Sequence, residues 1–226
     1  MENNFIYLDN ASTTPLSENV LNIINSTYRN YWHNPSSTYE LGIKCSTYLE
    51  KIRSKIAYIF EADAEDIIFT SGSSESTNIV FNNIYENFKN GRVVISNVEH
   101  QATTICANKL RKQNWDIYEW TVNNDGILNI SNIEKFLNND TKLVSIIWGQ
   151  SEIGTIQPVQ FIGSKCEELN IMFHLDGTQI LSNGIFSWKD LKCDFLSLSA
   201  HKFGGPKGIG ILLTKEKSRE ILKNKD

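Results

Sequence analysis

Three ionisable side chains stand at points of the sequence where apolar runs end. Lys202 lies beside His201, between an apolar run and a glycine-rich turn, and Asp176 directly follows another apolar run. Burying a charged group at the end of a strand is costly unless the group has a partner or a chemical task. A lysine held in such a place, next to closely approaching glycine backbone, indicates covalent chemistry.

A loop of small hydroxyl residues with one glycine, Thr70 to Glu75, lies between a predicted strand and a predicted helix. Backbone N–H groups and the dipole at a helix N-terminus favour the binding of a phosphate there. Each feature also has an ordinary reading. The loop fits a helix N-cap, and Asp176 fits a capping residue. By itself, His100 fits a packed or surface histidine, and the pair His201–Lys202 fits a basic loop end.

Together these features match the needs of one cofactor, pyridoxal phosphate. That cofactor requires a lysine for its Schiff base, an acid at its pyridine nitrogen, a phosphate cradle and a flat group over its ring. The chain supplies one of each, namely Lys202, Asp176, the loop 71–74 and His100. A carboxylate keeps the ring nitrogen protonated, which makes the ring an electron sink. We therefore expect a pyridoxal phosphate site.

The elements that must position these residues follow an alternating pattern from about residue 65 onward. Strands that read as continuous apolar runs, alternating with helices, predict a mostly parallel sheet covered on both faces, which is a three-layer α/β/α fold. Such sheets bind ligands at the carboxyl ends of their strands. The predicted strands are 67–70, 92–96, 116–120, 143–148, 172–175, 195–199 and 209–213. The predicted helices are 75–88, 101–112, 130–137 and 161–169.

The first 60 residues follow a different pattern. We expect a short strand at 7–9 and helices at 17–31 and 39–60, separated by the sequence HNPSS at 33–37. Proline disfavours helical backbone in the residue before it. The expected organisation is an N-terminal segment, 1–16, followed by one large cofactor-binding domain, 17–226.

Composition excludes several classes of protein. The chain has 226 residues and a net charge of −4, so no basic face argues for nucleic acid. No apolar run approaches the roughly 18 residues of a membrane span. The start MENNFIYLDN lacks the pattern of a signal peptide, so we expect a cytoplasmic protein. The four cysteines form no CxxC pair, which predicts free thiols in or near the core and no metal site.

Eight stretches resemble the NifS/IscS-type cysteine desulfurases, which are pyridoxal phosphate enzymes of fold type I in the class V aminotransferase family. They occur in the family's order across nearly the whole chain. The stretches are YLDNASTTP (7–15), HNPSS (33–37), IIFTSGSSEST (67–77), EHQA (99–102), LVSI (143–146), EIGTIQPV (152–159), HLDGTQ (174–179) and SLSAHKFGGPKGIG (197–210).

The resemblance implies a role for each matching residue. Lys202 would form the Schiff base, and Asp176 would pair with the pyridine nitrogen. His100 would stack on the ring and shuttle protons, and Gln179 would bond the phenolic oxygen. The residues implied to hold the phosphate are Ser73, Ser74, Ser199 and His201.

The resemblance also implies an activity and partners. The family converts L-cysteine to L-alanine and an enzyme persulfide, whose sulfur serves iron–sulfur cluster assembly or thio-modification. This implies a homodimer, L-cysteine as the substrate and a sulfur-acceptor protein.

The chain departs from the family pattern in two ways. Family members usually read Asn-Asn-Glu where this chain has Gln150-Ser151-Glu152, and Ser151 cannot offer the amide that contacts the cofactor. Family members also continue into a C-terminal domain that carries the persulfide-forming cysteine and the substrate-binding arginine. None of the four cysteines here matches that position. We therefore expect half of a split enzyme or a truncated form, the alternative being a non-catalytic binding protein with the same fold.

Overall fold

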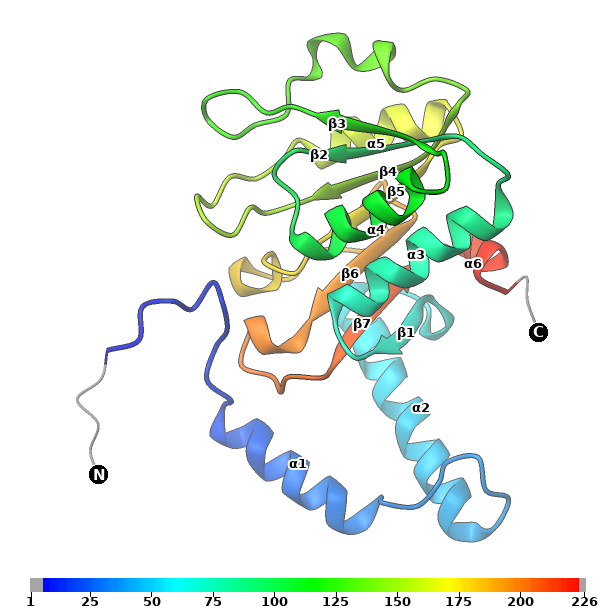
Figure 1. Cartoon of the computed structure of the whole chain (residues 1–226). Coiled ribbons are helices and arrows are strands. Elements are labelled where there is room, and N and C mark those ends of the chain that lie inside the picture. Colours follow the sequence, from blue (N-terminus) through cyan, green and yellow to red (C-terminus); the bar gives the residue numbers. More distant parts are fainter. Residues whose placement is uncertain (1–5, 224–226) are drawn as a thin grey trace.

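A computed structural model describes residues 6–223 of the chain, which form helices around one sheet (Figure 1). The strands are β1 Ile67–Thr70, β2 Arg92–Ser96, β3 Asp116–Trp120, β4 Thr141–Ile147, β5 Met172–Asp176, β6 Phe195–Ser199 and β7 Gly210–Thr214. The α-helices are α1 Glu18–Asn30, α2 Glu40–Phe60, α3 Ser73–Asn87, α4 Gln101–Arg111, α5 Val159–Glu168 and α6 Glu216–Lys223. Four 3₁₀ helices are η1 Ala64–Asp66, η2 Ile130–Lys135, η3 Leu181–Asn183 and η4 Ala200–Lys202.

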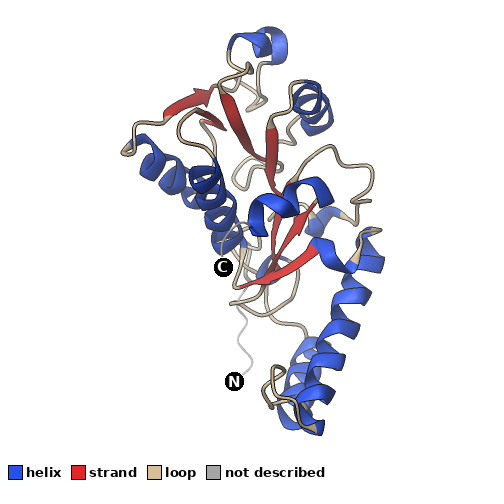
Figure 2. Ribbon diagram, turned by 90° about the vertical axis from the view of Figure 1, so that its right-hand side faces the viewer, coloured by secondary structure: helices blue, strands red, loops and turns tan. Residues whose placement is uncertain are grey.

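The seven-stranded sheet has the order β1-β7-β6-β5-β4-β2-β3. The five strands from β2 to β6 run parallel, whereas β7 pairs antiparallel with both β6 and β1. Figure 2 shows helices on both sides of the sheet. The predicted three-layer α/β/α fold with a mostly parallel sheet is confirmed.

The core explains why the strands read as continuous apolar runs. Val93 and Ile95 of β2 pack with α3 and α4 on one face of the sheet, whereas Val94 packs with α5 on the other. Successive side chains of a strand point to opposite faces, so a strand covered on both faces needs apolar side chains on both. β6 is buried along its whole length, and its two polar side chains, Ser197 and Ser199, hydrogen-bond to His174 and to Ser73.

Two local predictions are wrong. Residues 7–9 form no strand but an exposed extended segment, because no strand lies beside them to pair with. The backbone of Thr14 instead donates to the carbonyl of His201 (2.9 Å), which draws this segment across the ends of the strands. The helix expected at 130–137 is the shorter 3₁₀ helix η2, and the side chain of Asn129 caps it by accepting from the N–H of Ser131 (3.0 Å).

The four cysteines are free and buried, as predicted. Within residues 6–223, no helix is long and apolar enough to cross a membrane. The same residues contain no cluster of three or more His, Cys, Asp or Glu side chains that could hold a metal ion. Helix α1 has no buried residue, and α1 and α2 extend away from the sheet (Figure 1). The domain boundary expected at residue 17 stays a prediction.

Candidate active site

A cavity of about 710 Å³ lies at the carboxyl ends of β4, β5 and β6. All nine candidate residues from the sequence line it: Ser73, Ser74, His100, Ser151, Asp176, Gln179, Ser199, His201 and Lys202. They come from five separate stretches of the chain, which the parallel sheet brings to one edge. The grouping was expected, whereas the role of each residue stays a prediction.

The loop of small hydroxyl residues at 71–74, here called the hydroxyl loop, is fixed to the end of β6. Ser199 Oγ accepts from the backbone N–H of Ser73 (2.8 Å) and bonds its hydroxyl (3.0 Å). Glycine makes this approach possible, because a Cβ on Gly210 would lie 2.5 Å from the Cα of Gly72. Gly72 also has a φ of 151°, which side chains rarely permit. These glycines therefore let β7 and the loop pack against each other.

A second cavity of about 360 Å³ adjoins this loop and shares Ser73, Ser74, Ser199 and His201 with the first. It is also lined by Lys207, which the sequence analysis did not single out. Burial lowers the pKa of His201, and the charges of Lys202 and Lys207 lower it further. Hydroxyls, a helix N-terminus and a lysine suit a phosphate group. The donors present thus fit the phosphate of pyridoxal phosphate.

Lys202 is held by the N-terminal segment. Its Nζ donates to the carbonyls of Ala11 (2.6 Å) and Ser12 (2.9 Å). The Gln179 side-chain amide donates to the same Ala11 carbonyl (2.7 Å). Burial lowers the pKa of Lys202, while nearby carboxylates, led by that of Asp176, oppose this shift. A sequence pattern could not reveal these contacts, because the partners are backbone carbonyls from the far end of the chain.

Asp176 is buried, with 4% of its surface exposed. Its Oδ1 accepts from the backbone N–H of Thr178 (3.0 Å), and the Thr178 hydroxyl bonds the same oxygen. That hydroxyl also bonds Ser73 Oγ (2.6 Å). Thr178 thus links the acid to the hydroxyl loop. The sequence analysis missed it, although it lies between two residues that were named.

His100 lines the cavity and is the N-cap of α4. Its Nδ1 accepts from the backbone N–H of Ala102 (3.1 Å), which places the proton of a neutral imidazole on Nε2. Ser151 lines the cavity as well. The Gln150 side chain does not take the place of the family's amide there, because its Oε1 accepts from the N–H groups of Glu152 (2.7 Å) and Ile153 (2.9 Å) in its own turn.

Comparison with known proteins agrees with this geometry. Residues 6–224 match the family model described as aminotransferase class-V. The chain belongs to this family. The family is in general dependent on pyridoxal phosphate, in agreement with the donors around the cavity.

Curated relatives of this class-V chain are cysteine desulfurases. It is 34% identical over 215 residues to the cysteine desulfurase IscS of Clostridium botulinum, covering 94% of this chain and 54% of the relative. It is 35% identical over 217 residues to the mitochondrial cysteine desulfurase of Candida maltosa, covering 95% and 45%. The chain thus spans about half the length of the curated relatives it matches.

Solved structures agree with this family assignment. A NifS-like protein superposes with a TM-score of 0.90 at 32% identity, covering 93% of this chain and 59% of the other. A structure described as SspA in complex with cysteine superposes with a TM-score of 0.88 at 29% identity, covering 94% and 62%.

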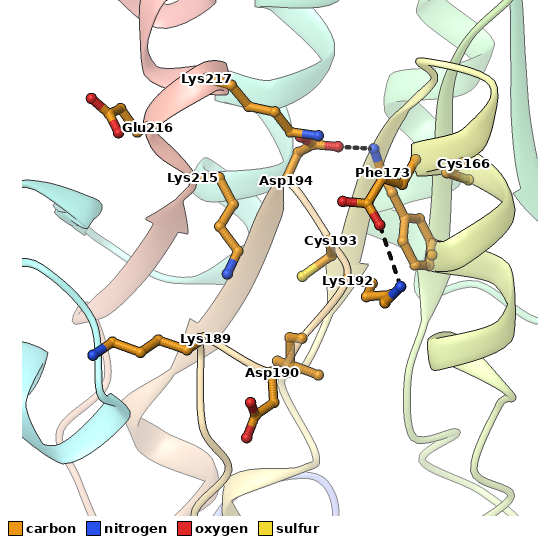
Figure 3. A pocket seen from close by; sticks show the side chains of 13 residues that line it. Cys166, Phe173, Lys189, Asp190, Lys192, Cys193, Asp194, Lys215, Glu216 and Lys217 are labelled. Carbon is orange, nitrogen blue, oxygen red and sulfur yellow. Dashed lines mark hydrogen bonds and ion pairs between the residues drawn. The ribbon is translucent and has the colours of Figure 1, made fainter.

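This chain has another cavity, of about 640 Å³, at the opposite end of the sheet, where β6 begins (Figure 3). Three of the four lysines that line it have local partners. Lys217 pairs with Asp194 (3.1 Å), Lys192 pairs with Glu167 (3.4 Å), and Lys215 donates to the carbonyl of Trp188 (2.6 Å). Among the described residues, no histidine or hydroxyl loop lines it. Of these two cavities, only the one that contains Lys202 combines a lysine with an acid, a histidine and the hydroxyl loop.

Proposed function

We propose that this chain binds pyridoxal phosphate at Lys202 and forms the cofactor-binding part of a cysteine desulfurase that acts on L-cysteine. One observation carries the proposal, namely that Lys202, Asp176 and the hydroxyl loop line the same cavity at the strand ends. When bound, the cofactor supplies an electron sink for the substrate. The relatives' names support the substrate class.

The residues that line the cavity would contact different parts of the cofactor. Asp176, as a buried carboxylate, would hold a proton at the pyridine nitrogen. His100 would lie against the ring, and Gln179 would bond the phenolic oxygen. The phosphate would be held by Ser73, Ser74, Ser199 and His201.

Lys202 is suited to covalent attachment. Burial favours its neutral amine, and only the neutral amine is a nucleophile. Before it can bind the cofactor, its Nζ must give up the carbonyls of Ala11 and Ser12. We therefore propose that loading displaces the N-terminal segment from the lysine.

Sulfur transfer requires a thiolate that this part of the chain does not present. All four cysteines are buried, and none lines the cavity. Burial raises the pKa of Cys106, Cys166 and Cys193, which keeps these thiols protonated. We propose that the persulfide-forming thiol is supplied by another polypeptide or segment. The later transfer of sulfur from the persulfide requires a sulfur-acceptor protein as well.

Borohydride reduction tests the attachment at Lys202. We expect reduction of the cofactor-loaded chain, followed by peptide mapping, to place the reduced adduct on Lys202. The variant Lys202→Arg should lose the adduct, because a guanidinium does not form it. The matched control Lys192→Arg, in the opposite cavity, should keep it. An adduct on another lysine, or no adduct at all, would contradict the proposal and favour the non-catalytic alternative.

The exposed apolar surface of α1 and α2 supports association. Exposed patches of this kind are uncommon on soluble monomers beyond a few hundred Å². Their exposed large apolar residues are Leu21, Ile23, Tyr28, Leu41, Ile43, Leu49, Tyr58 and Ile59. We propose that this surface is covered in a homodimer, a complex with a complementary C-terminal chain, or both.

Light scattering tests the association. We expect a mass above the 25.8 kDa of one chain, and a shift toward one chain in the double variant Ile23→Lys/Ile43→Lys. The control Ile105→Lys changes an exposed residue of α4 and should leave the mass unchanged. A well-folded monomer that is indifferent to a complementary chain would refute this proposal.

A further inference from the structure

One acid beside the site has no role in the function proposed above. Glu99 lies in the turn between β2 and α4, immediately before His100. Its Oε1 accepts from Ser96 Oγ (2.5 Å) and from the backbone N–H of Ile147 (2.7 Å). The carboxyl group therefore ties the turn that carries His100 to the end of β4.

The hydrogen bond from Ile147 to Glu99 lies just beyond the point where β2 and β4 stop pairing. The β2–β4 ladder ends at the pair Ile95–Ser145, whereas Ile147 still pairs with Asp176 of β5. The chain turns away after β2, so a backbone carbonyl no longer reaches the N–H of Ile147. Buried N–H groups need a partner, and the Glu99 carboxyl supplies it. The same side chain thus completes the sheet next to Asp176.

The second carboxyl oxygen of Glu99 indicates its protonation state. Oε2 is buried and has no hydrogen-bond partner in the part of the chain that the structure describes. An ionised oxygen in that position would be costly. Burial raises the pKa of Glu99 to about 8, and the charge of Asp176 adds to this, although the bonds from Ser96 and Ile147 oppose it.

The groups that face Glu99 come from four elements. β5 contributes the carboxylate of Asp176, and α4 is preceded by the titratable His100. The contacts from β2 and β4 are Ser96 and Ile147, neither of which carries a charge. The principal charge acting on Glu99 is therefore a negative one.

We propose that Glu99 is a positioning residue that works as a neutral acid, fixing the His100 turn to β4 and leaving the negative charge of this strand end to Asp176. Its consequence for the cofactor rests on the proposed function, because Asp176 is the partner proposed for the pyridine nitrogen. An ionised Glu99 would set two like charges side by side at this strand end and so disfavour the carboxylate form of Asp176 that the pairing needs.

Carbon NMR of the chain labelled at the glutamate carboxyl carbons tests the protonation state, without cofactor. We expect one resonance to titrate at about pH 8, and to be missing from the spectrum of Glu99→Gln. The control Glu168→Gln, which changes an exposed glutamate, should lose a different resonance. A Glu99 resonance that titrates near its ordinary value of about 4.3 would overturn the proposal.

Amide hydrogen exchange at Ile147 tests the positioning role. Glu99→Ala should speed this exchange about ten-fold or more, because the N–H loses its acceptor. Glu99→Gln should keep the wild-type rate and the wild-type His100 ring shifts, because its amide oxygen accepts the same bond. The role would be refuted if Glu99→Gln exchanged as fast as Glu99→Ala. It would also be refuted if the wild type and both variants exchanged the Ile147 amide at the same rate. Both the NMR titration and the amide exchange are measured without cofactor. Failure of the chain to bind cofactor would therefore refute the proposed function, but these two measurements would still test the role of Glu99.

Discussion

Replacing Asp176 with alanine is expected to slow the chemistry of the cofactor-loaded chain about 100-fold or more, while part of the cofactor stays bound. Removing one preorganised electrostatic partner of a transition state costs roughly 3 kcal/mol. Asp176 is buried, so water does not replace its charge effectively. The readout is α-hydrogen exchange of the amino acid substrate in heavy water, followed by NMR, with bound cofactor measured by absorbance.

A second variant separates the charge of Asp176 from its hydrogen bonds. Asp176→Asn keeps an oxygen that can accept from the backbone N–H of Thr178, which Asp176 Oδ1 accepts at 3.0 Å. If the charge matters most, asparagine should be nearly as slow as alanine. Exchange at the wild-type rate in either variant would contradict the role proposed for the carboxylate.

The second large effect concerns His174, which is fully buried under the site. Its Nδ1 and Nε2 lie 2.8 Å from Ser145 Oγ and Ser197 Oγ. His174→Leu would leave both hydroxyls buried without this partner, at about 1–3 kcal/mol each. We expect the free energy of unfolding to fall by about 3 kcal/mol, measured by urea denaturation. Adding Ser145→Ala and Ser197→Ala should recover part of that loss, and no recovery would show that the lost bonds are not its cause.

The same histidine predicts a dependence on pH. Burial lowers the pKa of His174 to about 3, below its value of about 6.5 in the unfolded chain. Its contribution to stability is therefore present above about pH 6.5 and is lost as pH falls toward 3. The stability difference between wild type and His174→Leu should shrink over that range. A constant difference would mean that His174 is already charged in the folded protein.

The sequence by itself determined the sheet and the place of the site. Runs such as 92–96 and 195–199 carry apolar side chains on both faces of the strand because helices cover both faces of the sheet, and this local pattern needs no knowledge of distant contacts. Residues that directly follow such runs must lie at one edge when the strands are parallel. For this reason the order of residues along the chain is enough to group Lys202, Asp176 and the hydroxyl loop.

Only the tertiary structure decided what holds these residues and which charge they carry. The carbonyls of Ala11 and Ser12 reach Lys202 from the other end of the chain, and such backbone partners leave no mark on the sequence. The strand expected at 7–9 failed for the same reason, since a strand requires a neighbour that the local sequence does not specify. The sequence analysis assigned no role to Glu99, because only the folded chain buries it next to Asp176, and this burial raises the pKa of Glu99 to about 8. Desolvation depends on every atom packed around a group, and that is a property of the folded chain.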